Sequence, residues 1–295
     1  MSQPLLSRLY KARQAAHGVP VTSWSAPPQV VVICNQKGGC GKTTTAINLA
    51  AGLGLKGYPS LLIDLDPQAH ASLGLGFDVE HLSHTMYDLF QDRTRLFEEI
   101  IQPTRIQNLW LAPANHLLAG AQLELATVPN REHVLRQVIS RLPTRFRFLV
   151  IDCSPSLNLL TINALAAADF CLIPLQPHYF ALEGMKELFM TIELIHTQFN
   201  SRLEVLGILP MCVDRHARIT RELLGQIRDY FHEQVTATMV RFSAELIEAS
   251  IVGQPVFLYA PRSDGAKDYA ELTEELFTRM SRVAAASPGN DGAPA

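Results

Sequence analysis

Short apolar runs alternate along this chain with longer stretches whose apolar residues recur at helical spacing. Continuous apolar runs are typical of strands buried on both faces, and we expect strands at 30–34, 61–65, 109–111, 148–151, 170–173, 205–209 and 256–258. Helical spacing predicts helices at 43–56, 130–142, 156–168, 182–199, 219–231 and 267–283. The alternation predicts an α/β fold with a mainly parallel, doubly wound sheet flanked by helices. Such sheets bind ligands beyond the carboxyl ends of their strands.

The two ends of the chain differ from this middle part. Residues 1–28 hold a short amphipathic stretch and a Pro-rich SAPPQ linker, and we treat them as an N-terminal extension. Its apolar and basic residues are Leu5, Leu6, Leu9, Tyr10, Arg8, Lys11 and Arg13. Residues 284–295, AAASPGNDGAPA, have the composition of a disordered tail. One α/β domain is therefore expected at 29–283.

Composition excludes several classes of protein. The 295 residues are 47% hydrophobic and 18% charged with a net charge of −3, which argues against a disordered chain, a fibre or a histone-like polycation. No apolar run approaches the roughly 18 residues that cross a bilayer, so we expect a cytoplasmic protein. Five cysteines without a CxxC pair favour reduced thiols.

The strongest motif is VVVICNQKGGCGKTTTAINLA at 30–50, in which a strand, a glycine loop and a helix follow one another. This is the order that a phosphate-binding loop requires, because its backbone N–H groups and the helix N-terminus both attract anions. The residues expected to bind the phosphates are Lys37, Gly38, Gly39, Cys40, Gly41, Lys42, Thr43 and Thr44. Lys42 is expected to reach the β- and γ-phosphates, and the Thr43 hydroxyl to ligate Mg²⁺.

Two further apolar runs end in carboxylates. Asp64 and Asp66 end the run at 61–65 and lie on the same side of the expected strand, while Asp152 follows the run at 148–151. A carboxylate at the tip of a buried strand is costly unless a metal or hydrogen-bond donors meet it. These residues are therefore candidates for the metal side of a nucleotide site.

The phosphate loop departs from the plain Walker pattern, since Gln36 stands where the first glycine would be and Lys37 follows it. In this the chain resembles the deviant Walker A ATPases of the ParA/MinD superfamily. YFALEGMKEL at 179–188, MCVDRHARIT at 211–220 and LYAPRSDGAKDYAEL at 258–272 resemble the ParA/Soj branch. The resemblance extends over about 29–283 and implies a P-loop NTPase-like fold and a slow, partner-dependent ATPase that uses ATP and Mg²⁺.

The resemblance also implies roles for individual residues. Lys37 would reach across a dimer to the phosphates held by the other subunit, and with Lys42 would stabilise negative charge there. Asp66 would orient the attacking water. Asp152 would hold Mg²⁺ through water, and Asp64 would support the metal shell.

Two smaller predictions concern residues close to these motifs. By the resemblance, Met211 and Pro261 are expected beside the adenine ring. Cys34, Cys40 and Cys153 each flank a nucleotide motif, so they are a candidate redox group near the phosphates. The alternative is that they are small apolar fillers, and thiol labelling that ignored ATP would support it.

For function, the resemblance implies a homodimer that forms around ATP and binds nucleoid DNA without sequence preference. A ParB-like or other activating protein would trigger hydrolysis, and the role would be chromosome or plasmid partition. Another cargo, such as a chemotaxis cluster, a microcompartment or polysaccharide machinery, stays open, as does a MinD-like membrane-associated regulator. No stable membrane association is expected, because a basic amphipathic helix does not end the chain.

Arginines are the candidate DNA contacts, since the guanidinium fork suits phosphate. The expected contacts are Arg215, Arg218, Arg221 and Arg241. Residues 202–262 hold seven Arg against seven Asp or Glu, so a basic surface there must come from folding and not from net charge. A second basic group is Arg131, Arg136, Arg141, Arg145 and Arg147.

Overall fold

A computed structural model of the chain describes residues 27–142, 145–178, 181–214 and 217–286. Its described strands form one sheet in the order β3-β4-β2-β5-β1-β6-β7, and all neighbours pair in parallel except β3 with β4. The strands are β1 (Gln29–Ile33), β2 (Ser60–Leu65), β3 (Gln102–Pro103), β4 (Leu109–Ala112), β5 (Phe148–Cys153), β6 (Phe170–Leu175) and β7 (Glu204–Pro210). The predicted α/β fold with a mainly parallel sheet is therefore confirmed.

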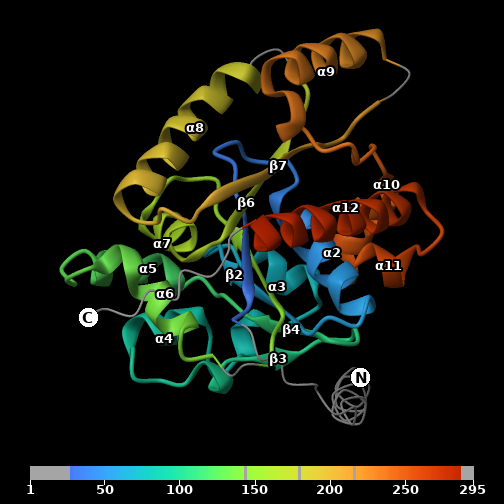
Figure 1. Ribbon diagram of the computed structural model, residues 1–295. Helices are drawn as coiled ribbons and strands as arrows, with labels where there is room; N and C mark the ends of the chain where they lie inside the picture. The colour runs from blue at the N-terminus through green and yellow to red at the C-terminus, as the bar shows by residue number, and fades with distance from the viewer. Residues whose placement is uncertain (1–26, 143–144, 179–180, 215–216, 287–295) are drawn as a thin grey trace, which may run out of the picture.

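Helices cover both faces of this sheet (Figure 1). One face packs on α2 (Lys42–Leu55), α3 (His70–Gly74), α10 (Ala244–Ile251), α11 (Val256–Tyr259) and α12 (Asp264–Ala286). The other face packs on α4 (Met86–Gln91), α5 (Leu118–Leu125), α6 (Val134–Ile139), α7 (Leu159–Ala167), α8 (Ala181–Gln198) and α9 (Arg218–Phe231). Single 3-10 turns lie at Val79–His81, Phe97–Glu99, Arg131–His133 and His232–Gln234.

The central strands are apolar without interruption because each face of the sheet has its own core. In β1, Val30 and Val32 belong to the core under α7 and α8, whereas Val31 and Ile33 belong to the core under α2 and α12. All four are at most 4% exposed. The period of two is therefore present in the structure, but both positions of the period are buried.

Several predicted elements need correction. The run at 256–258 is not a strand, because it forms the helix α11, whose first amide, that of Val256, donates to Asn48 Oδ1 on α2 at 2.9 Å. Periodicity cannot separate a short buried helix from a short buried strand. The helix expected at 130–142 starts as a 3-10 turn and ends at Ile139. The last helix continues to Ala286, so the first part of the predicted tail at 284–295 is helical.

The order of the strands brings the nucleotide motifs together. The carboxyl ends of β2, β5, β1 and β6 are neighbours, and Asp152 of β5 pairs with Asp64 of β2 on one side and with Ile33 of β1 on the other. The loop after β1 therefore lies beside both carboxylate-bearing strand ends, at the edge where ligands bind. Among the described helices, none has the length and apolar character needed to cross a membrane.

Candidate functional site

The loop between β1 and α2 has the backbone of a phosphate cradle. Gly39 and Gly41 have φ values of 71° and 91°, in the left-handed region that favours glycine. A Cβ at Gly41 would lie 2.5 Å from Met211 Cε, so a side chain here would displace the end of Met211 in addition to straining the backbone. Apart from the chain neighbours of each glycine, no atom of the described residues lies within 4 Å of a Cβ built on Gly38 or Gly39, which leaves their side of the loop open to a ligand.

Polar side chains hold this loop against β6. Asn35 Nδ2 donates to the Pro174 carbonyl at 2.7 Å, and Asn35 Oδ1 accepts the Lys37 amide at 3.0 Å. Gln176 Nε2 donates to the Gly39 carbonyl at 3.0 Å. These contacts within the protein fix the shape of the loop, as expected of a preorganised anion site.

The two lysines of the loop differ in burial. Lys42 is 6% exposed, and its ammonium donates to the Lys37 carbonyl at 3.0 Å, so the loop backbone surrounds this charge. The Lys37 side chain is exposed. Burial, and then the positive charge of Lys37, lowers the pKa of His178, which places this ring near Lys37. Lys42 is therefore enclosed by its own loop, whereas Lys37 lies at the surface.

Hydrogen-bond donors surround Asp64 at the end of β2. Its Oδ2 accepts from the Ser72 amide at 2.8 Å and the Ser72 hydroxyl at 2.7 Å, and its Oδ1 accepts the Asp66 amide at 3.1 Å. Burial nonetheless raises the pKa of Asp64 from 3.8 to about 6, and the bonds from Ser72 oppose this rise. Asp66 is 7% exposed, and its Oδ1 accepts the Gln68 amide at 2.9 Å.

Asp152 is the least compensated of the three buried carboxylates. It is fully buried, and within the described residues no hydrogen bond of standard geometry reaches either of its carboxylate oxygens. Burial and then the charge of Asp64 raise the pKa of Asp152 well above its usual range, whereas nearby Thr43 and Lys42 lower it. A carboxylate of this kind is expected where a cation or an ordered water belongs.

The residues around Asp152 fit a Mg²⁺ ion that also binds phosphate. Carboxylate and hydroxyl oxygens are the ligands that Mg²⁺ prefers, and Asp152 and Thr43 offer one of each. In the described part of the chain, no three His, Cys, Asp or Glu side chains converge in a geometry that would hold a metal on their own. The remaining ligands would have to be phosphate oxygens and water.

Behind the loop, α12 is tied to α2 through buried polar atoms. The Tyr269 and Thr45 hydroxyls lie 3.1 Å apart, and Thr45 Oγ1 is 3.8 Å from the Met211 sulfur. Tyr269 and Thr45 are completely buried, and Met211 is 2% exposed. Met211 thus packs under Gly41, while Pro261 is exposed in the turn between α11 and α12. Their contact with adenine stays a prediction.

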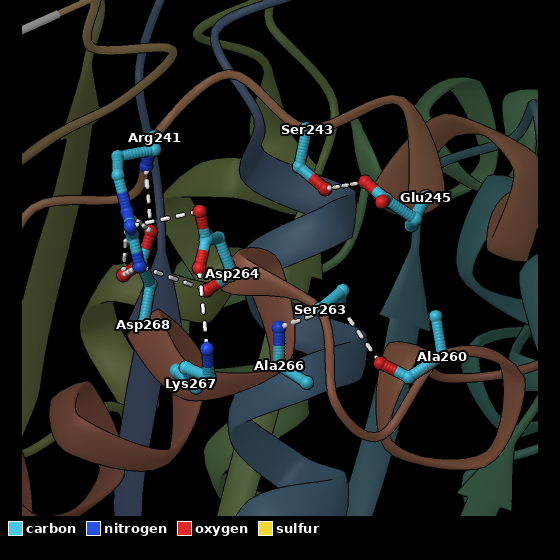
Figure 2. Close-up of polar contacts among 9 residues, drawn as sticks. All are labelled: Arg241, Ser243, Glu245, Ala260, Ser263, Asp264, Ala266, Lys267 and Asp268. Carbon is cyan, nitrogen blue, oxygen red and sulfur yellow. Dashed lines mark hydrogen bonds and ion pairs between the residues drawn. The ribbon is translucent and has the colours of Figure 1, made fainter.

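The expected DNA contacts are in different environments. Figure 2 shows Arg241 held by two carboxylates of α12: its guanidinium donates to Asp268 at 2.6–3.1 Å and pairs with Asp264 at 2.9 Å. Arg218 is exposed and pairs with Glu222 at 2.7 Å, and Arg221 is exposed on the same helix, α9. Arg215 lies outside the described residues. Their binding to DNA stays a prediction, and for Arg241 the phosphate would compete with Asp268.

The second basic group is also partly engaged. Arg145 lies over the Trp110 and Phe146 rings, at 5.6 and 4.8 Å from their centroids, and burial lowers its pKa. Arg131 pairs with Glu132 at 3.1 Å. These contacts use the planar guanidinium for packing within the fold.

The cysteines near the nucleotide motifs are enclosed. Cys34, Cys40 and Cys153 are at most 2% exposed, and burial raises the pKa of both Cys40 and Cys153. The Cys34 sulfur lies 2.9 Å from that of Cys171, a residue that was not a candidate. A raised pKa reduces the thiolate fraction and hence reactivity, which favours the filler interpretation.

Three residues of the site were missed in the sequence. Ser72 is the main donor to Asp64 but lies eight residues further on, and Gln176 follows β6 and contacts the loop across the sheet. Gln176 could have been found from the rule that the ends of neighbouring parallel strands share one edge. Asp268, by contrast, looks like any other charge on an amphipathic helix, and no local signal marks its pairing with Arg241.

A cavity of about 270 Å³ opens beside Thr43 and Thr44. Its other walls come from α3, with His70 and Leu73, and from α10, with Leu246. The segment from 241 to 264 therefore borders the phosphate loop, although it is about 200 residues away in the sequence.

Comparison with known proteins agrees with this geometry. A family model described as an AAA domain matches residues 28–205, which include the phosphate loop and the strands that carry Asp64 and Asp152. A crystal structure of cobyrinic acid a,c-diamide synthase from Mycobacterium smegmatis, with bound ATP analog and magnesium, superposes with a TM-score of 0.76 at 30% identity, over 86% of this chain and 96% of that one. The fold and the site define a P-loop ATPase.

Two curated relatives narrow the class. The chain is 42% identical over 265 residues to the chromosome partitioning protein ParA of Myxococcus xanthus, covering 90% of this chain and 93% of that protein. It is 38% identical over 248 residues to the sporulation initiation inhibitor protein Soj of Bacillus subtilis, covering 84% and 98%. The chain belongs to the ParA/Soj family of deviant Walker A ATPases, as its sequence motifs predict.

Proposed function

We propose that this chain is a ParA-like partition ATPase that binds Mg-ATP, dimerises around it, and holds DNA until a partner triggers hydrolysis. The observation that carries the nucleotide part is Asp152, a buried carboxylate without a hydrogen bond among the described residues, placed beside an open glycine cradle. A solved relative at 30% identity was crystallised with an ATP analog and magnesium, and ATP and Mg²⁺ are the cofactors that fit here.

Within one subunit the roles follow from position. Thr43 and Asp152 would hold Mg²⁺, which neutralises charge on phosphate oxygens when bound, and Asp64 would be a neighbouring support held by Ser72. Lys42 would place its ammonium against the β- and γ-phosphates. Asp66, whose Oδ1 already accepts one amide bond, would accept a hydrogen bond from the attacking water and orient it.

Lys37 supports the dimer. Its side chain is exposed, while its amide and carbonyl are both used to shape the loop. An ammonium in this position, in two chains that face one another across ATP, would neutralise phosphate charge that each chain alone leaves uncovered. The dimer would therefore form with ATP and come apart after hydrolysis.

The Lys37→Ala variant tests this arrangement. Loss of a charge that meets phosphate across the interface should weaken ATP-dependent dimerisation by roughly 30-fold, or about 2 kcal/mol, while binding of ATP by single chains changes little. Light scattering with a non-hydrolysable analogue and calorimetric nucleotide titration measure the two quantities. The matched control is Lys186→Ala on α8. If Lys37→Ala dimerised like the parent, the trans contact would be wrong.

The Asp66→Ala variant tests the water-orienting role. Hydrolysis should fall by about 100-fold or more, because the group that positions the nucleophile is gone, while ATP still binds. The ATP-bound dimer should then persist on DNA, which a filter-retention time course would record. Dissociation at the parent rate would show that hydrolysis does not govern release.

DNA binding and partition are the parts of the proposal that rest on similarity to relatives and not on the geometry of one site. They are supported by relatives at 38–42% identity that are named chromosome partitioning ParA and Soj, over at least 84% of this chain. Retention of non-specific DNA should be strong with ATP and weak with ADP or without nucleotide, at one fixed salt concentration. Nucleoid association in cells and stimulation by a ParB-like protein would follow. Equal retention in all three nucleotide states would reject this part and leave the ATPase intact.

A further inference from the structure

An exposed apolar patch lies on α10 and the elements that pack beside it. Its residues, between 38% and 78% exposed, are Leu73, Ile247, Ile251, Val252, Leu258 and Tyr259. Figure 1 shows α10 and α11 together at one side of the molecule, next to the start of α12. Isolated apolar residues at a surface need no explanation, but a contiguous group indicates a binding surface.

The elements that carry the patch contact one another. On α10, Leu246 and Ala249 are buried, so Ile247 and Ile251, one turn apart, point the opposite way. The Tyr259 hydroxyl donates to Glu248 Oε2 at 2.9 Å, which joins α11 to α10. Gly253 and Gly76 are so close that a Cβ on either would meet the backbone of the other within 3 Å, which joins the end of α10 to the end of α3.

The segment that carries most of the patch has acidic residues and no basic ones. Residues 242–260, FSAELIEASIVGQPVFLYA, contain Glu245 and Glu248 and no Lys, Arg or His. A partner for this surface should therefore be apolar and basic at once.

The chain carries such a segment at its own N-terminus. Leu5 and Leu9 are four residues apart, as are Leu6 and Tyr10, and this spacing is that of apolar helix-in-groove anchors. Arg8, Lys11 and Arg13 lie among them, and no Asp or Glu occurs before Asp64. Residues 1–26 are outside the described structure, so only their sequence and their length support binding to the patch.

We propose that residues 5–13 of the same polypeptide bind the apolar patch, with their basic side chains against Glu245 and Glu248. Residues 14–26 can span up to about 43 Å at 3.3 Å each, which exceeds twice the roughly 18 Å radius of gyration of a domain of this size. Leu73 belongs to the patch and also lines the cavity at Thr43 and Thr44, so the bound segment lies at the edge of that cavity. The patch is thus a surface near the nucleotide site that binds another segment of the same chain.

Zero-length cross-linking of the full chain tests this directly. A carbodiimide joins a lysine to a carboxylate only where they touch, and mass spectrometry should find Lys11 joined to Glu245 or Glu248. The contact between Lys56 and Glu274 provides an internal control in the same sample. If the control product formed and no Lys11 product to these two residues did, the proposal would be wrong.

Variants separate the patch from a general effect. Replacing both Ile247 and Ile251 with Ser should lower the Lys11 product by about five-fold or more, because the apolar contact is lost, while the Lys56–Glu274 product persists and reports an intact fold. The matched control is Leu123→Ser, an 80% exposed leucine on α5. An equal loss in this control, or none in the double variant, overturns the assignment.

Isotope mixing decides whose segment binds. In a mixture of ¹⁴N- and ¹⁵N-labelled chains, the Lys11 products should carry one label throughout. Products that join the two labels would mean that the segment reaches a second copy, which contradicts the proposal. Neither result depends on ATP hydrolysis, so the outcome is independent of the proposed function.

Discussion

The phosphate loop and the segment 241–264 border the same cavity, yet their residues acquire their roles in different ways. In the loop, Gly39 and Gly41 have left-handed backbone and Lys42 bonds a carbonyl five residues before it, so the geometry is local. In the other segment, Arg241 depends on Asp268, 27 residues away and on another element. The first region can be recognised from its motif alone, whereas the second has to be folded before its chemistry is defined.

The difference also concerns what the buried charges are for. Asp268 is 3% exposed and is compensated by Arg241 and its amide, so it stabilises the fold. Asp152 is just as buried, but no hydrogen bond among the described residues compensates its charge. The free-energy cost of burying this charge is therefore expected to be offset when a ligand binds. A compensated charge indicates structure, and an uncompensated one indicates a site.

The largest expected effect comes from Arg241→Ala. Removing the guanidinium leaves Asp268 buried with a single hydrogen bond, the one from the backbone amide of residue 241. The free energy of unfolding should therefore fall by about 2–4 kcal/mol. Urea unfolding measures it, with Arg221→Ala as the control, for which a change within about 0.5 kcal/mol is expected. If Arg241→Ala kept its stability and lost DNA retention, the residue would be a DNA contact and the distinction drawn above would fail.

An intermediate effect is expected for Asp152→Asn, in the absence of nucleotide and Mg²⁺. Burial raises the pKa of Asp64 to about 6 and that of Asp152 well above 3.8, so the folded chain binds more protons than the unfolded chain above about pH 4. Stability of the parent should therefore fall as pH rises above about 4, and the part of this fall that Asp64 contributes should be complete above about pH 6. Asp152→Asn should raise the free energy of unfolding at pH 7 by about 1–3 kcal/mol.

Unfolding curves between pH 4 and pH 8 measure this effect. The exposed Asp229→Asn is the control and should follow the parent at every pH. The variant should also lose the stabilisation that Mg²⁺ and nucleotide provide together. A variant less stable than the parent at pH 7 would show that Asp152 is compensated after all.

The smallest effect is expected for Tyr269→Phe, which removes one hydroxyl behind the phosphate loop. Thr45 would lose its 3.1 Å partner, at a cost of about 1 kcal/mol. Tyr259→Phe, at an exposed hydroxyl bonded to Glu248, is the control and should change stability by less than about 0.5 kcal/mol. Equal effects of the two substitutions would contradict a special role for the buried bond.

Prediction from the sequence succeeded where the residues of one segment are sufficient to determine its structure. The six expected strands from 30–34 to 205–209 are present within a residue or two at each end, because fully buried strands in this sheet are continuous apolar runs. The run at 256–258 failed because its partner is the side chain of Asn48 and not a strand. The two-residue strand β3 and short helices such as α3 and α10 are too brief for periodicity to mark them.

The sequence alone is enough to recognise the class of protein, the phosphate loop with Lys37, Lys42 and Thr43, and the three aspartates. Each of these residues stands at or just after the end of an apolar run, where backbone geometry dictates its place. Which of the charges are already paired can be seen only in the folded chain. Arg241 proved to be bound by Asp268, Asp64 by Ser72, and Asp152 by no hydrogen bond among the described residues. The physical reason is that hydrogen bonds and ion pairs act over a few ångströms in space and are indifferent to separation along the chain.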